Sequence, residues 1–135
     1  VPLNNVSPNA FEFTDPGTGR RLAAALDANF ALVYDANKAK KGQFIQIYCN
    51  GLGPVDTTPP SGEPSSANPL ARTTTAPTVT IGGRPAEVIF SGLAPGIVGL
   101  YQINVRVPAD APSGLQPVTI QMGNVTGKTT NLPIE

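Results

Sequence analysis

Histidine and tryptophan are absent from this sequence of 135 residues, and cysteine occurs once. Without histidine, the chain cannot form a Ser-His-Asp or Cys-His catalytic arrangement, nor the usual zinc site. One cysteine cannot form an internal disulfide, so cysteine content does not indicate the redox compartment. Because Cys49 lies in an apolar run, we expect a small buried hydrophobe rather than a reactive thiol.

Charged residues are scarce, and the two signs balance. Lys plus Arg and Asp plus Glu number 9 each, which gives a formal net charge of zero. A nucleic-acid-binding protein normally carries a basic excess or a basic stripe, so we expect no nucleic-acid partner. No apolar run reaches the roughly 18 residues that cross a bilayer, so we expect no membrane span.

Proline and glycine are abundant instead, with 15 Pro and 14 Gly. They separate runs in which apolar and polar residues alternate. In the clearest run, Tyr101, Ile103, Val105 and Val107 point towards the expected core, and Gln102, Asn104 and Arg106 point the other way. This mixture favours many short strands joined by turns and argues against a helical bundle.

Further strands are expected at 43–49, 78–81, 84–90, 115–122 and 130–135, and the fourth of these is expected to turn Val118, Ile120 and Met122 inward. In segment 43–49, Ile45, Ile47 and Cys49 lie on one side of the expected strand. Phe44, Gln46 and Tyr48 lie on the other side. We expect the first set to face the core and the second to face away. Gly82-Gly83 is a strong indication of a two-residue hairpin turn, after which Ala86, Val88 and Phe90 are expected on one face.

The N-terminal part contains the turn sequence Asp15-Pro16-Gly17-Thr18-Gly19. It favours a hairpin, although the Ala-rich segment 21–26 would also suit a short helix. Turn sequences then recur about every ten residues, a spacing typical of antiparallel sandwiches. We therefore predict an all-β, Ig-like antiparallel β-sandwich of about seven or eight strands with an N-terminal hairpin.

The Gly51-x-Gly53 pair resembles part of a phosphate-binding loop. Such a loop needs a following helix whose N-terminus faces the anion, but here Pro54 and a proline-rich stretch follow. The pair is therefore interpreted as a turn. Residues 54–77 have almost no apolar periodicity and are expected to form a long surface crossover between strands.

Several of these segments together resemble an uncharacterised Ig-like domain family found near the C-termini of large secreted proteins of soil bacteria. The resemblance runs from about Pro8 to the end of the chain. The segments that carry it are Gly51-Leu52-Gly53-Pro54, Pro69-Leu70-Ala71, Gly82-Gly83-x-Pro85-Ala86 and the run from Gly92 to Pro108. It implies a linker or a preceding domain's last strand at 1–7, one Ig-like domain at 8–135, no catalytic residues and no cofactor.

Three aromatic residues are candidates for ligand binding. Tyr34, Phe44 and Tyr48 could offer flat apolar surfaces to a sugar or to a partner domain. Phe44 and Tyr48 share the outward side of their strand. The alternative is that the 54–77 loop lies over them.

The acidic residues suggest no catalytic pair, because they are scattered over expected loops and strand ends. Asp15, Asp27 and Asp35 are weak candidates for calcium ligands, since calcium prefers oxygen. The alternative is that they are solvated loop acids. The basic cluster of Lys38, Lys40 and Lys41 has two interpretations as well, a solvated loop or a site for an anionic partner.

These observations favour a non-enzymatic structural, adhesive or interaction module at the C-terminus of a secreted or cell-envelope multidomain protein. The expected partners are neighbouring domains of the same polypeptide, a polysaccharide or a surface protein. The alternative is a carbohydrate-binding accessory module of a secreted enzyme. In both cases the chain is expected to be secreted or at the cell surface.

Overall fold

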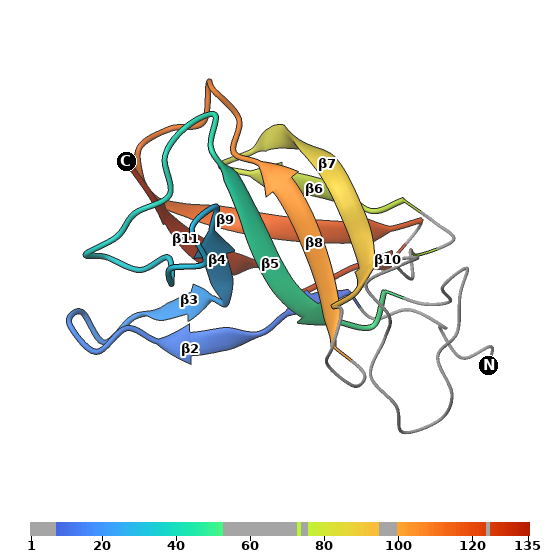
Figure 1. The fold of residues 1–135 in the computed structure, drawn as a ribbon, viewed down its shortest axis with the longest axis horizontal. Helices are drawn as coiled ribbons and strands as arrows, with labels where there is room; N and C mark the ends of the chain where they lie inside the picture. The colour runs from blue at the N-terminus through green and yellow to red at the C-terminus, as the bar shows by residue number, and fades with distance from the viewer. Residues whose placement is uncertain (1–7, 53–72, 74–75, 95–99, 124) are drawn as a thin grey trace.

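The computed structural model of the chain describes residues 8–52, 73, 76–94, 100–123 and 125–135. This part of the chain contains eleven β-strands and no helix (Figure 1). The strands are β1 (Asn9–Ala10), β2 (Glu12–Thr14), β3 (Arg21–Ala23), β4 (Ala25–Asp27), β5 (Phe44–Asn50), β6 (Thr78–Ile81), β7 (Arg84–Leu93), β8 (Tyr101–Arg106), β9 (Gly114–Met122), β10 (Val125–Thr126) and β11 (Thr130–Ile134).

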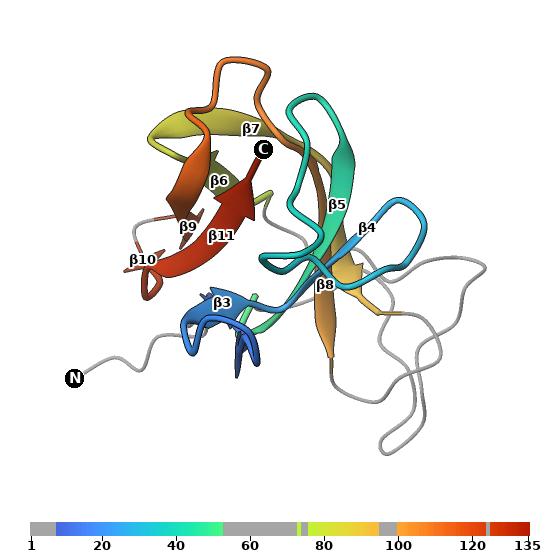
Figure 2. The same ribbon diagram turned by 90° about the vertical axis from the view of Figure 1, so that its left-hand side faces the viewer.

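Most strands belong to one curled antiparallel sheet in the order β1-β5-β8-β7-β6-β9-β10. Two short strands share an edge with others, since β4 also pairs with β5 and β11 also pairs with β9. Figure 2 shows β6, β9 and β11 grouped apart from β4, β5 and β8, with β7 passing between the groups. The predicted all-β sandwich is confirmed. The strand number exceeds the expected seven or eight because short strands share two edges: β1 and β4 both pair with β5, and β10 and β11 both pair with β9.

The core between these layers is aliphatic. Its buried members include Ile45, Ile47, Ile103, Val105, Val79, Ile81, Val118, Ile120, Leu132 and Ile134. The inward sets predicted for β5, β8 and β9 are thus confirmed. Each fully buried Val or Ile side chain contributes about 1.5–3 kcal/mol. All eight aromatic residues lie in the described segments, yet none belongs to this cluster; only Tyr101 packs against it.

Three contacts tie the C-terminal part of the chain to its first third. The Ala39 N–H donates to the Pro133 carbonyl at 3.0 Å, and the Glu135 N–H donates to the Ala39 carbonyl at 2.8 Å. The Lys128 ammonium lies 2.6 Å from a carboxylate oxygen of Glu12. The two hydrogen bonds of Ala39 hold β11 beside the segment before β5, and Lys128 links the segment just before β11 to β2.

The N-terminal hairpin is present as β2 and β3, which form a second, two-stranded sheet. Its turn is closed by the Asp15 N–H, which donates to the Arg20 carbonyl at 2.8 Å. The hairpin interpretation is therefore confirmed, and the alternative of a short helix is wrong. Residues 1–7 and most of the expected 54–77 crossover lie outside the described residues.

The face predicted for Phe90 is wrong. Val88 pairs with Val105, but Phe90 pairs with Asn104, because a β-bulge shifts the register between them. A bulge inserts one extra residue, here Ile89, so the side chains beyond it change sides. Phe90 therefore lies on the side of Asn104 and not on the inward face of Val88; it is buried there but is absent from the core cluster.

The predicted hairpin turn at Gly82-Gly83 is confirmed, since Ile81 pairs with Arg84 across it. Both glycines have positive φ, 63° and 78°. A side chain at Gly82 would also collide with its surroundings, because an added Cβ would lie 2.9 Å from Pro112 Cδ. At Gly83 nothing lies within 4 Å of that position.

This difference makes the two glycines a matched pair. We expect Gly83→Ala to lower the free energy of unfolding by about 1–2 kcal/mol, the cost of a left-handed backbone at a residue with a Cβ. Gly82→Ala carries the same cost plus the collision with Pro112, so its loss is expected to be larger. Urea unfolding of both variants measures the difference. Equal losses would contradict the close approach at Gly82.

Candidate functional site

The side of β4, β5, β8 and β7 that faces away from the core is here termed the outer face. Its residues are Leu26 on β4, Phe44, Gln46 and Tyr48 on β5, Gln102, Asn104 and Arg106 on β8, and Glu87 and Phe90 on β7. Strand register arranges them in rows, because directly opposed residues of antiparallel strands point to the same side. One row runs through Leu26, Gln46, Asn104 and Phe90, and another through Phe44, Arg106 and Glu87.

Aromatic side chains gather on or beside this face. The predicted outward positions of Phe44 and Tyr48 are confirmed by their alternation with the buried Ile45, Ile47 and Cys49. Phe90 joins them through the bulge. Phe11 lies next to Tyr48, since its N–H donates to the Tyr48 carbonyl at 3.0 Å.

Amide side chains form a connected network between the aromatic residues. The Gln102 Nε2 group donates to Asn104 Oδ1 at 2.7 Å and to Gln46 Oε1 at 3.2 Å. The Tyr48 hydroxyl donates to the same Gln46 oxygen at 3.2 Å. Burial raises the pKa of Tyr48, so the phenol keeps the proton that it donates.

A groove of about 340 Å³ opens on this face and is lined by Ala28, Phe44, Ile45, Gln46, Ile89 and Asn104. Its apolar walls are accessible, since Phe44 is 40% and Ile89 48% exposed. The Arg106 guanidinium carbon lies 4.6 Å from the centroid of the Phe44 ring, within cation–π range.

Part of this groove could not be predicted from the sequence. Alternation alone placed Gln46 and Asn104 outward, but only the β5–β8 register brings them opposite each other. The sequence did not predict that Ile89 lines the groove, because a bulge in a strand of β-branched and aromatic residues has no reliable sequence pattern. Whether the 54–77 loop lies over Phe44 and Tyr48 falls outside the described residues.

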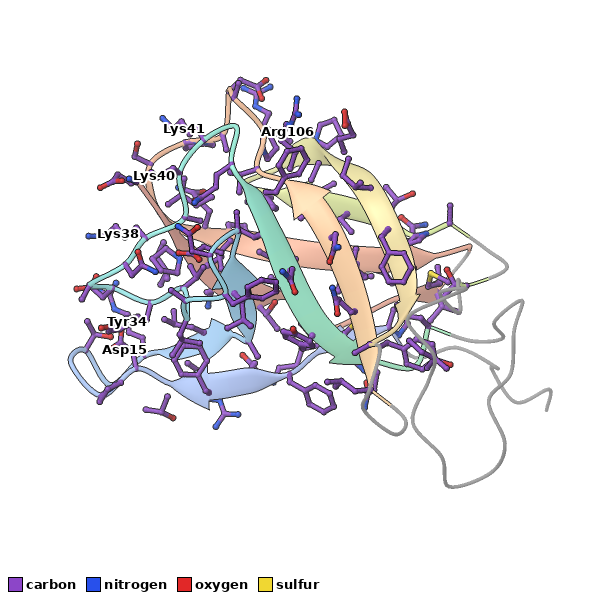
Figure 3. All side chains as sticks on the ribbon, viewed as in Figure 1. Asp15, Tyr34, Lys38, Lys40, Lys41 and Arg106 are labelled. Carbon is purple, nitrogen blue, oxygen red and sulfur yellow. The ribbon has the colours of Figure 1, made fainter. Side chains whose placement is uncertain are left out.

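Tyr34 does not join the outer face. It lies in the connection between β4 and β5, half-buried, and its backbone pairs with Asn37. Figure 3 shows it on the side of the molecule that carries the β2–β3 hairpin, away from Arg106. The three aromatic candidates are therefore divided between two places.

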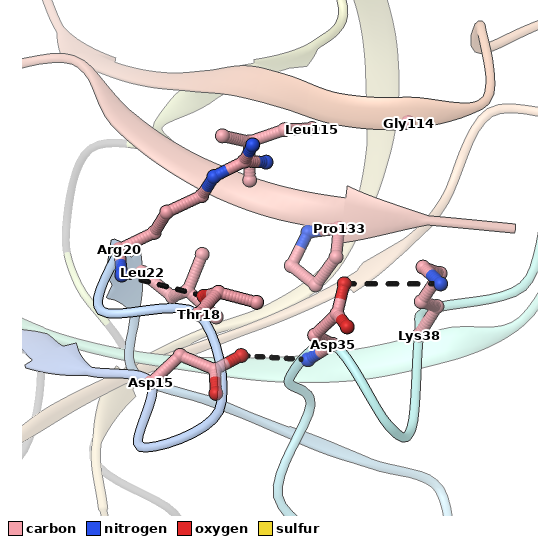
Figure 4. Close-up of a pocket in the computed structure, with 9 residues that line it drawn as sticks. All are labelled: Asp15, Thr18, Arg20, Leu22, Asp35, Lys38, Gly114, Leu115 and Pro133. Atoms are coloured by element: carbon pink, nitrogen blue, oxygen red, sulfur yellow. Dashed lines mark hydrogen bonds and ion pairs between the residues drawn. The ribbon is translucent and has the colours of Figure 1, made fainter.

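Asp15 and Asp35 come together at a smaller pocket of about 130 Å³ beside the hairpin (Figure 4). One Asp15 oxygen accepts the Asp35 N–H at 3.0 Å and the other accepts the Gly17 N–H at 2.8 Å. These bonds, the one from Asp35 first, hold the pKa of Asp15 below its usual value. The Asp35 carboxylate itself lies 3.8 Å from the Lys38 ammonium.

Asp27 plays a similar part in a neighbouring turn. Its Oδ1 accepts the N–H groups of Ala31 at 3.0 Å and Asn29 at 2.8 Å, and its Oδ2 accepts Asn37 Nδ2 at 3.1 Å. The pKa of Asp27 is lowered, chiefly by the Ala31 N–H. The turn holds Phe30 at a positive φ of 62° with 69% of the residue exposed.

The two carboxylates thus secure the same loop, since Asp15 binds the backbone of Asp35 and Asp27 binds the side chain of Asn37. Within the described ranges, no group of three or more Asp, Glu, His or Cys side chains could hold a metal ion. The Asp15 and Asp27 carboxylates therefore have a structural role, and calcium binding stays a prediction.

Cys49 is fully buried in the core and has no disulfide partner. Burial raises the pKa of its thiol to about 12. At neutral pH the thiolate, which is the nucleophilic form, is therefore almost absent. The expectation of a small buried hydrophobe is confirmed.

Among the segments that the structure describes, no helix is long and apolar enough to cross a membrane. Comparison with known proteins found no matching family model, no matching curated protein and no matching solved structure. The resemblance to a secreted Ig-like family therefore stays a prediction.

The lowered pKa of Asp15 predicts a pH-dependent stability. Its ionised form is favoured in the folded chain, so its contribution is present above the usual pKa of 3.8 and is lost as the pH falls through the lower, folded-state pKa. We expect Asp15→Asn to lower Tm at pH 7 and to flatten the fall in Tm between about pH 5 and pH 2.5.

Thermal unfolding across this range checks the expectation. Asp110→Asn is the control, because Asp110 is exposed and contacts the exposed Arg84 at 3.8 Å. The control variant should keep the wild-type slope. Equal slopes for wild type and Asp15→Asn would mean that the bonds from Asp35 and Gly17 do not stabilise the carboxylate.

The calcium hypothesis predicts that millimolar calcium raises Tm and that a chelator reverses the rise, because a ligand of the folded state stabilises it. Asp35→Asn would remove the increase, whereas Asp110→Asn would retain it. A melting curve that calcium leaves unchanged would eliminate this site.

Proposed function

We propose that this chain is a non-enzymatic interaction module of a secreted or cell-envelope multidomain protein, and that it binds through the outer face. The observation that carries the proposal is the distribution of aromatic residues. The core cluster contains only aliphatic residues, Cys49 and Met122, while Phe44, Tyr48 and Phe90 lie on the opposite side of the sheet.

This distribution is unusual in physical terms. Aromatic rings bury 150–250 Å² each and commonly dominate protein cores. Here no aromatic ring belongs to the core cluster, although Phe90 is buried, and the exposed Phe44 leaves apolar area in contact with water. Aromatic and arginine side chains are also the residues that contribute most to binding energy at interfaces. The Arg106–Phe44 pair has this composition.

The part of the chain that the structure describes contains no evident catalytic arrangement, which supports a non-enzymatic role. The chain has no histidine. Asp15 and Asp27 accept backbone N–H groups, and the Cys49 thiol is buried with a pKa of about 12. The low charge content and the many threonine, glycine and proline residues suit an exported β-module.

A carbohydrate-binding accessory module is the second candidate. The amide network favours it, because Gln46, Gln102 and Asn104 place hydrogen-bonding groups beside the exposed Phe44 ring. Ligand sites of this kind combine an apolar surface with a few fixed polar groups.

Truncation of Phe44 tests the role of the outer face. We expect Phe44→Ala to weaken binding to the partner at least about tenfold, in line with the loss of an aromatic anchor, without changing the fold. Leu115→Ala is a matched control, since Leu115 is 37% exposed, close to the 40% of Phe44, and lies on β9. Retention on a panel of immobilised polysaccharides and on neighbouring domains of the native polypeptide measures the effect. If both variants bind as the wild type does, the outer face is not the interaction surface.

A further inference from the structure

The groove on the outer face presents hydrogen-bond donors in a fixed direction. The oxygens of Gln46 and Asn104 both accept from the Gln102 amide nitrogen. In a planar amide the oxygen and the NH₂ group lie on different sides of the carbonyl carbon. The NH₂ groups of Gln46 and Asn104 are therefore turned away from Gln102. No residue in the described part of the chain accepts a hydrogen bond from either group.

A cation lies beside these donors. Arg106 is the neighbour of Phe44 in the strand register, and its guanidinium stacks on the ring. Glu87 is its other neighbour, on β7, but no ion pair joins them in the part of the chain that the structure describes. Figure 3 shows Arg106 and Lys41 at the same end of the molecule. An acceptor-rich, negatively charged ligand would complement this arrangement.

We propose that the groove binds a carboxylate-bearing polysaccharide, a polyuronate. The NH₂ groups of Gln46 and Asn104 donate to ring oxygens or hydroxyls, the apolar side of a sugar ring contacts Phe44 and Ile89, and the carboxylate meets the guanidinium of Arg106. This assignment rests on the proposed function and identifies the partner of the same face.

An acidic peptide fits less well. The groove lies on a sheet face, where the backbone groups of β5 and β8 are already paired with each other. A peptide would bring N–H groups that find few acceptors in a groove lined by amide donors and apolar side chains. Sugar hydroxyls accept as well as donate, so they leave fewer polar groups unsatisfied.

Polygalacturonate and its methyl ester provide the test, because they share one backbone and differ in charge. The chain has a formal net charge of zero, so overall attraction does not favour the acidic polymer. By affinity electrophoresis we expect the acid to bind about tenfold more tightly than the ester, the effect of one charge-assisted contact. Arg106→Gln should remove that difference and leave binding of the ester unchanged.

Two further variants test whether the charge near the groove determines the affinity. Arg21→Gln makes the same change of charge on β3, an exposed position of the second sheet, and should keep the wild-type affinity. Glu87→Gln removes the acid next to Arg106 and should raise the affinity for polygalacturonate. Arg106, Arg21 and Glu87 are all exposed, so these variants are expected to fold, which circular dichroism verifies.

Each contrary result overturns a defined part of the proposal. Equal binding of acid and ester overturns the carboxylate assignment; if Phe44→Ala still weakens both, the proposed function stands. Equal losses from Arg106→Gln and Arg21→Gln indicate unspecific attraction and overturn the site. Binding of polyglutamate as tightly as polygalacturonate overturns the sugar assignment. Failure to bind either polysaccharide overturns the inference, whereas the proposed function fails only if Phe44→Ala binds every partner as the wild type does.

Discussion

The register between β5 and β8 places Ile45 opposite Val105 and Ile47 opposite Ile103. Because strand side chains alternate with a period of two, a slip by one residue would turn these aliphatic residues to the outside and bring Gln46 and Asn104 into the core. Burying unpaired amides is costly. The aliphatic core therefore holds the register, and the register in turn aligns the amides and aromatic residues of the outer face.

The bulge in β7 links the two layers of the sandwich. Residues up to Ala86 pair with β6, residues from Glu87 onward pair with β8, and the bulge follows two residues after this change of partner, between Val88 and Phe90. A bulge bends its strand and increases the local twist, which suits a strand that passes from one layer to the other. The same extra residue moves Phe90 to the outer side and leaves Ile89 as a wall of the groove. A feature that shapes the fold thus also shapes the candidate site.

Two acidic residues, Asp15 and Asp27, stabilise individual turns. Asp15 and Asp27 satisfy backbone N–H groups in two turns and between them secure the loop that holds Asp35 and Asn37. Aspartate is well suited to such turns because its short side chain reaches N–H groups two residues ahead. The clustering of acids in the first third of the chain, which suggested calcium, thus has a local structural explanation.

Much of the fold follows from the sequence by itself. Period-two alternation predicted the inward sets of β5, β8 and β9, and the turn sequences at Asp15–Gly19 and Gly82-Gly83 predicted two hairpins, because these signals depend on neighbouring residues alone. Alternation predicted the outward positions of Phe44 and Tyr48 in the same way. The absence of histidine can be read directly from the sequence. Tertiary structure decided which outward residues meet: it opposed Gln46 to Asn104, stacked Arg106 on Phe44, separated Tyr34 from both and moved Phe90 across the sheet. Those outcomes depend on strand pairing between distant segments and on one inserted residue, and alternation within a single strand carries no information about either.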